Sequence, residues 1–179
     1  MMKRAPLPTI LLLLPAAIGV SILGGCRKQN STQINYQMGE RIVAGPMVYN
    51  VVQTVWRTQL GDLFKLRTPE HRFLVVTLSA TNSGGKEVSI PFLTLEGPDR
   101  KEYREIEDGD GVDNWFGLLR TIQPAETRQG EVVFDVPLTS YRLRLTDGGE
   151  PGTEKNVWVD MPLRMDTDTS ITAPAPGQK

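Results

Sequence analysis

Short runs of alternating apolar and polar residues constrain the fold of this chain more than any other feature. The clearest run is residues 73–82 (FLVVTLSATN), where Leu74, Val76, Leu78 and Ala80 share one parity. A period of two is the mark of a β-strand, because successive side chains point to opposite faces. The first half of this run is apolar on both parities, which is typical of a central strand covered on both sides. Similar runs occupy residues 47–60, 87–95, 130–136, 141–145 and 156–161.

Turn residues separate these runs, and no long stretch has the 3.6-residue period of an amphipathic helix, although residues 115–122 could hold one helical turn. About seven short strands in this order predict an all-β, immunoglobulin-like antiparallel β-sandwich over residues 45–164. A domain of about 120 residues buries roughly two-thirds of its unfolded surface, so it needs no metal or disulfide to fold. Residues 165–179 are rich in Thr, Pro and Ala and are predicted to form a disordered tail.

Composition excludes several classes of protein. A single cysteine, Cys26, rules out an intramolecular disulfide, and one cysteine with one histidine cannot make a four-ligand structural zinc site. The net charge is −1 with scattered Lys and Arg residues, so nothing favours nucleic acid as a partner.

Residues 1–25 have the order of a secretory signal peptide: basic Lys3 and Arg4, an apolar stretch, then small residues. Pro15 and Gly19 interrupt the apolar stretch, which is short for a stable membrane span. We therefore expect a cleaved signal, the alternative being an uncleaved membrane anchor. Either outcome places the remaining chain outside the cytoplasm.

The only cysteine follows directly. Leu23-Gly24-Gly25-Cys26 resembles the bacterial lipobox, which implies that a diacylglyceryl group is attached to the sulfur of Cys26 and that the signal is cut before it. Two or three acyl chains at about 0.8 kcal/mol per buried methylene hold a protein on a bilayer stably. Residue 27 is Arg rather than the Asp that favours inner-membrane retention, which implies the outer membrane if the host has one. Residues 26–44 are polar, and we expect a lipidated Cys and flexible tether there, with a reach of roughly 23 Å for a coil.

Three stretches together resemble the family called domain of unknown function 4352. They are residues 73–82 (FLVVTLSATN), 119–130 (LRTIQPAETRQG) and 131–137 (EVVFDVP). The resemblance departs mildly at Pro124-Ala125-Glu126, where Ala125 occupies a position at which glycine is usual. It implies an extracytoplasmic immunoglobulin-like sandwich, and it implies no known reaction and no catalytic residues.

Few residues suggest chemistry. Asp108, Asp110 and Asp113 are weak candidates for a metal site, since Val112 and Leu119 stand where a calcium loop would place further oxygen ligands. Ser83-Gly84-Gly85-Lys86 matches the Ser-x-x-Lys of serine acyl-enzymes, but it lies between two predicted strands and is interpreted as a hairpin turn. His71 is expected on the surface, and Arg142 with Arg144 could contact an anionic partner or simply form a solvated strand face.

The sequence thus favours a non-enzymatic interaction or scaffolding domain, held on the cell envelope by a lipid at Cys26 and contacting an envelope protein. No cofactor is expected. The alternative is a small-ligand or calcium-binding lipoprotein that uses the acidic loop 105–113 together with Trp115.

Overall fold

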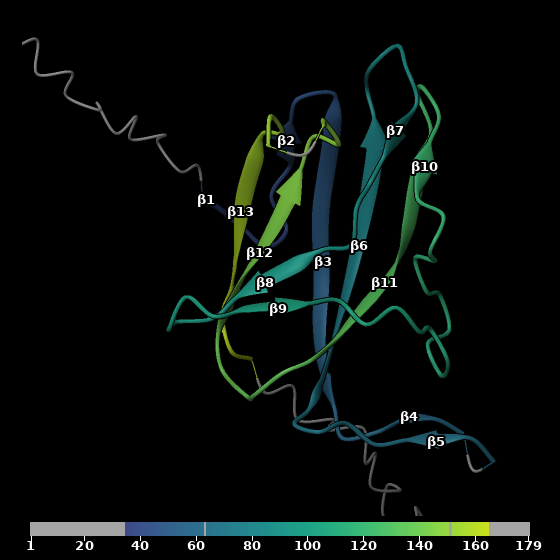
Figure 1. The fold of residues 1–179 in the computed structure, drawn as a ribbon, viewed down its shortest axis with the longest axis vertical. Helices are drawn as coiled ribbons and strands as arrows, with labels where there is room; N and C mark the ends of the chain where they lie inside the picture. The colour runs from purple at the N-terminus through teal and green to yellow at the C-terminus, as the bar shows by residue number, and fades with distance from the viewer. Residues whose placement is uncertain (1–34, 63, 151, 165–179) are drawn as a thin grey trace, which may run out of the picture. The chain divides into compact units, whose positions relative to one another are not determined.

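The computed structural model describes residues 35–62, 64–150 and 152–164, which form two β-sheets packed face to face (Figure 1). The five-stranded sheet has the order β1 (Asn35–Gln37), β13 (Asn156–Met161), β12 (Tyr141–Thr146), β8 (Thr94–Glu96) and β9 (Glu102–Arg104). The four-stranded sheet has the order β11 (Thr127–Asp135), β6 (Phe73–Asn82), β3 (Met47–Arg57) and β2 (Ile42–Ala44). Two short ladders complete the fold, β10 (Thr121–Ile122) with β7 (Val88–Ser89) and β4 (Leu60–Gly61) with β5 (Leu66–Arg67). The predicted all-β sandwich is confirmed, and none of the described residues is helical, including 115–122.

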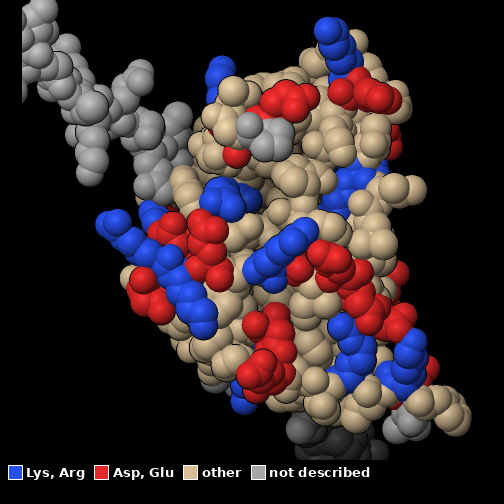
Figure 2. All heavy atoms as spheres, in the orientation of Figure 1, with Lys and Arg blue, Asp and Glu red and all other residues tan. Residues whose placement is uncertain are grey.

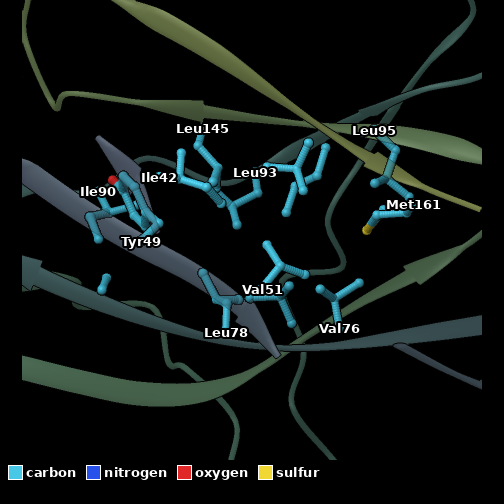
Figure 3. Packing of buried hydrophobic residues seen from close by; sticks show 14 of the residues in the cluster. Ile42, Tyr49, Val51, Val76, Leu78, Ile90, Leu93, Leu95, Leu145 and Met161 are labelled. Carbon is cyan, nitrogen blue, oxygen red and sulfur yellow. The ribbon is translucent and has the colours of Figure 1, made fainter. Parts of the chain in front are cut away.

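The main core fills the space between the two sheets. Figure 3 shows Leu93, Leu95 and Leu145 facing Val51, Val76 and Leu78 across it. The alternation predicted from the sequence is confirmed on three strands. The buried side chains on the inner face of β6 are Leu74, Val76, Leu78 and Ala80. On β11 and β12 they are Val132, Phe134, Leu143 and Leu145.

β6 is apolar on both parities because its outer face covers a second, smaller hydrophobic cluster. Phe73 and Val75 point away from the main core and are buried with Leu60 and Val133. Ile106 and Val112, from the acidic loop, pack against the same cluster. The acidic loop and the β4 region therefore cover one end of the outer face of the four-stranded sheet.

A β-bulge explains the mixed pattern in residues 47–60. The register of β3 against β6 shifts between Val51 and Gln53, so the intervening residue is skipped. Tyr49 and Val51 are buried before the bulge and Thr54 after it, while Val52 is 53% exposed. An extra residue reverses which parity faces the core, and this is why residues 47–60 have apolar side chains on both parities.

The domain begins earlier than the sequence predicted. Residues 35–44 were expected to belong to the tether, but the structure has β1 and β2 there, with Ile42 and Ala44 fully buried in the main core. β1 pairs in parallel with β13, and β2 pairs with β3. Strands of three residues are too short to show a period, and β1 finds its partner at the far end of the chain. The predicted signal peptide, the lipidated Cys26 and the predicted tail at 165–179 lie outside the described residues.

The connection from β11 to β12 contains a tyrosine corner. The hydroxyl of Tyr141, at the start of β12, donates a hydrogen bond of 2.7 Å to the carbonyl oxygen of Pro137. Its ring packs against Trp56 and, edge on, against Tyr103, with centroid distances of 6.4 and 5.7 Å. A tyrosine that closes back on the preceding turn is typical of immunoglobulin-like sandwiches.

Candidate functional site

The acidic loop 105–113 was the main binding candidate from the sequence, and the structure turns its first residue inward. Glu105 and Arg120 form an ion pair whose side chains are 0% and 1% exposed. Nη1 of Arg120 donates to Oε2 of Glu105 at 2.8 Å, and Nη2 contacts Oε1. Glu105 also accepts the backbone N–H of Leu93 at 3.0 Å, and Nε of Arg120 donates to the carbonyl of Gly117 at 2.6 Å. Glu105 therefore fastens the loop to the sandwich and is withdrawn from any solvent-facing site.

Sequence reasoning missed Arg120, because a charged residue beside a loop is expected in solvent. Its guanidinium lies over the rings of Phe92 and Phe116, at 4.8 and 5.4 Å from their centroids. The aromatic residues around it were the available signal, since guanidinium groups stack on aromatic faces.

The candidate metal ligands Asp108, Asp110 and Asp113 line one depression, but basic side chains lie among them. Lys65 pairs with the carboxylate of Asp110, and its hydrogen bond lowers the pKa of that carboxyl below the usual range. Arg67 lies 3.8 Å from a carboxylate oxygen of Asp108 and donates to the backbone carbonyls of Asp108 and Asp110, at 3.1 and 2.7 Å. The oxygens that would have to bind a calcium ion therefore already accept hydrogen bonds from Lys65 and Arg67. In the described part of the chain, no three His, Cys, Asp or Glu residues are grouped to hold a metal ion.

An open depression of about 540 Å³ lies beside this loop. The residues that line it are Glu107, Asp108, Gly109, Asp110, Val112, Asp113, Trp115 and Leu118. The loop packs closely on the indole of Trp115, since a Cβ added at Gly109 would meet the ring at 2.1 Å. The structure therefore brings Trp115 next to the acidic loop, as the ligand-binding alternative requires.

Arg142 and Arg144 share the outer face of β12, and both have acidic neighbours. Arg142 pairs with Glu96 of β8, and Nη1 of Arg144 lies 2.9 Å from Oε1 of Glu102 of β9. Both guanidinium groups lie over the ring of Trp158, at 5.1 and 5.8 Å. Figure 2 shows the outcome as basic and acidic side chains side by side on the left of the molecule. This arrangement supports the solvated-face interpretation over an anion-binding one.

The Ser-x-x-Lys match at residues 83–86 lies in the connection between β6 and β7, as expected, but these strands belong to different sheets, so the connection is not the predicted hairpin. The preceding residue, Asn82, is fully buried and donates from its amide to the carbonyls of Lys86 and Ile122, at 2.7 and 2.9 Å. Its side-chain oxygen accepts the N–H of Gly84 at 2.9 Å. Asn82 therefore organises the turn, and Ser83 and Lys86 are not placed on one face of a helix.

His71 sits at a loop end, half exposed. Its Nδ1 lies 3.8 Å from a carboxylate oxygen of Asp135, and its backbone N–H donates to the same carboxylate at 2.8 Å. Asp135 also accepts the N–H of Glu70 at 2.6 Å, so its contacts order the start of β6.

Comparison with known proteins identifies the fold and a family without a described function. The family model "Domain of unknown function (DUF4352)" matches residues 36–157. No curated protein matches the sequence. Within the described residues, no helix is long and apolar enough to cross a membrane.

Solved structures similar to this chain include the yjhA protein of Bacillus subtilis, with a TM-score of 0.55 and 13% identity over 70% of this chain and 98% of that one. The secreted protein MPT63 of Mycobacterium tuberculosis has a TM-score of 0.50 and 17% identity, over 74% of this chain and 98% of that one. A candidate lipoprotein, ycdA of Bacillus subtilis, has a TM-score of 0.50 and 16% identity, over 68% of this chain and 38% of that one. At these identities the likeness concerns the fold.

Proposed function

Because the chain belongs to the family of domain of unknown function DUF4352, we propose that it is a lipid-anchored lipoprotein of the cell envelope whose β-sandwich is a non-enzymatic interaction or scaffolding domain. The observation that carries the anchor is Leu23-Gly24-Gly25-Cys26 directly behind a signal-like segment. The family match begins at residue 36, so the domain follows the anchor after a short connection. A candidate lipoprotein and a secreted protein among the structural neighbours agree with a place outside the cytoplasm.

The contacts made by the polar residues that were candidates for a functional site support the interaction role. Glu105 joins a buried ion pair with Arg120, and Asp108 and Asp110 hold Arg67 and Lys65. Asn82 organises a turn. These side chains are engaged in stabilising the fold and the shape of its surface.

The experiment that tests the anchor compares the wild type with Cys26→Ser in cells supplied with labelled palmitate. We expect label in the wild type only, and we expect only the wild type to stay with membranes after a carbonate wash. Ser21→Cys combined with Cys26→Ser is a matched control, since it restores a thiol outside the lipobox and should remain unlabelled. Membrane retention of Cys26→Ser, or absence of label in the wild type, would refute the proposal.

A calcium- or small-ligand-binding role is the second candidate, favoured by the depression in which four carboxylates lie beside Trp115. The test is a calcium titration followed by tryptophan fluorescence. An unchanged signal up to millimolar calcium removes calcium, whereas a saturable change that Asp113→Asn abolishes would establish it.

A further inference from the structure

The β4–β5 hairpin projects from one end of the domain and carries apolar side chains into solvent (Figure 1). Phe64 is 97% exposed and Leu66, two residues on, is 53% exposed. A single exposed apolar residue is ordinary on a protein surface, but two at the end of a projecting hairpin are a common feature of interaction sites.

Asp62 fastens the backbone of two described residues of the hairpin. Oδ1 of Asp62 accepts the backbone N–H of Phe64 at 2.8 Å and that of Lys65 at 3.0 Å. These two bonds tie the backbone N–H groups of Phe64 and Lys65 to the carboxylate of Asp62. They also lower the pKa of the Asp62 carboxyl, so both bonds persist in mildly acidic solution.

The acidic loop braces the hairpin from the side. Two paired residues on each strand cannot make a stable hairpin alone. Lys65 and Arg67 supply the missing contacts through Asp110 and the carbonyls of Asp108 and Asp110. The backbones also approach closely, since a Cβ at Gly111 would lie 2.2 Å from the amide nitrogen of Gly61. These contacts meet part of the cost of ordering Lys65 and Arg67 before any partner arrives, which favours binding.

An acidic hollow adjoins this apolar tip. Asp110 contacts Lys65 of the hairpin and also lines the depression of about 540 Å³, together with Glu107, Asp108 and Asp113. With Asp62 at the tip, carboxylates outnumber the Lys and Arg side chains that contact them. Figure 2 shows Asp and Glu side chains running toward the lower right of the molecule, with Lys and Arg side chains beside them, where Figure 1 places the hairpin.

We propose that Phe64 and Leu66 form a docking knob for an envelope protein that offers an apolar pocket with Lys or Arg at its rim, the rim entering the hollow around Asp113. This inference rests on the proposed interaction role. Charge complementarity favours a basic protein surface over a membrane as the partner, because an anionic leaflet would repel the carboxylates around the hairpin. A second copy of this chain is disfavoured as the partner, because its own hairpin would bring the same excess of carboxylates to the contact. The hairpin and β1, the first described strand, lie on opposite sides of the domain in Figure 1, which leaves the hairpin accessible to a partner.

The test places photoreactive benzoylphenylalanine at position 64 of the full chain in its native membranes. The control carries the same probe at Val43 on β2, which is 42% exposed and outside this surface. A second form combines the probe at position 64 with Asp113→Lys, which alters the hollow without removing a contact of the brace. We expect a protein adduct at position 64 and not at 43, with Lys or Arg in the captured peptide. Asp113→Lys should lower its yield about tenfold, and added salt should lower it too.

Each other outcome overturns the inference: adducts with lipid alone, adducts with a second copy of the chain, equal yields at 64 and 43, or an adduct indifferent to Asp113→Lys. Capture of a protein at Val43 but not at 64 would remove this surface and leave the proposed function standing. Failure of palmitate to enter the wild type would instead remove the lipid anchor, whatever position 64 captures.

Discussion

Removing one partner of the buried Glu105–Arg120 pair should destabilise the domain severely. Glu105→Leu leaves the guanidinium with the carbonyl of Gly117 as its remaining hydrogen-bond acceptor among the contacts described, at a site where it is 1% exposed. An uncompensated buried charge costs about 3–5 kcal/mol, and the N–H of Leu93 loses its acceptor as well. We therefore expect a loss of about 4 kcal/mol in the free energy of unfolding.

The assay is urea unfolding of residues 32–179, the part of the chain that contains the β-sandwich, followed by tryptophan fluorescence. With a urea m-value of about 1.5 kcal/mol/M, the loss corresponds to a fall of about 2.7 M in the unfolding midpoint. The double variant Glu105→Leu/Arg120→Met removes both charges, and it should be more stable than either single variant because no ion is left unpaired.

The exposed pair Arg104–Glu107 is the control. Its atoms lie 3.2 Å apart and its side chains are 65% and 59% exposed, so Glu107→Leu should cost less than about 1 kcal/mol. The reasoning is refuted if Glu105→Leu costs as little as this control, or if the double variant is the least stable of all.

Three further predictions concern single positions. Ala125 has φ of +63°, a left-handed conformation that costs a non-glycine residue about 1–2 kcal/mol. Ala125→Gly should therefore stabilise the domain by about 0.5–1 kcal/mol, after the larger backbone entropy of glycine in the unfolded state is subtracted, and should raise the urea midpoint. A lower midpoint contradicts this. Asn82→Ala leaves the carbonyls of Lys86 and Ile122 and the N–H of Gly84 without their partner and should cost about 3 kcal/mol by the same assay, whereas Ser83→Ala should cost little. Burial, and secondarily the charge of Asp147, raises the pKa of Tyr49 above its ordinary value near 10, so the folded state holds this proton more tightly than the unfolded state. The stability that the protonated Tyr49 hydroxyl contributes is complete below about pH 10 and falls at higher pH, by at most about 1.4 kcal/mol per pH unit. Urea midpoints measured from pH 8 to 11 should therefore fall less steeply in Tyr49→Phe than in the wild type. Equal slopes would refute this prediction.

The sequence alone was enough to predict the elements whose signal is local. The long strands β6 and β11 and the six-residue β12 show their period within one element, and the turn residues between them mark the breaks. The Ser83–Lys86 turn and the surface position of His71 follow from the same local pattern. The lipid anchor at Cys26 was inferred in this way too and remains a prediction, because position 26 lies outside the described residues.

Only the tertiary structure decided the features that depend on distant partners. β1 is a strand because β13 pairs with it, and Ile42 is core because β2 is held against β3. Glu105 and Arg120 are buried because the loop between them, residues 106–119, brings them together, while Asp110 of the same loop stays outside and pairs with Lys65. The physical reason is that burial and pairing are properties of the assembled sheets, whereas periodicity and turn preference are properties of a few consecutive residues.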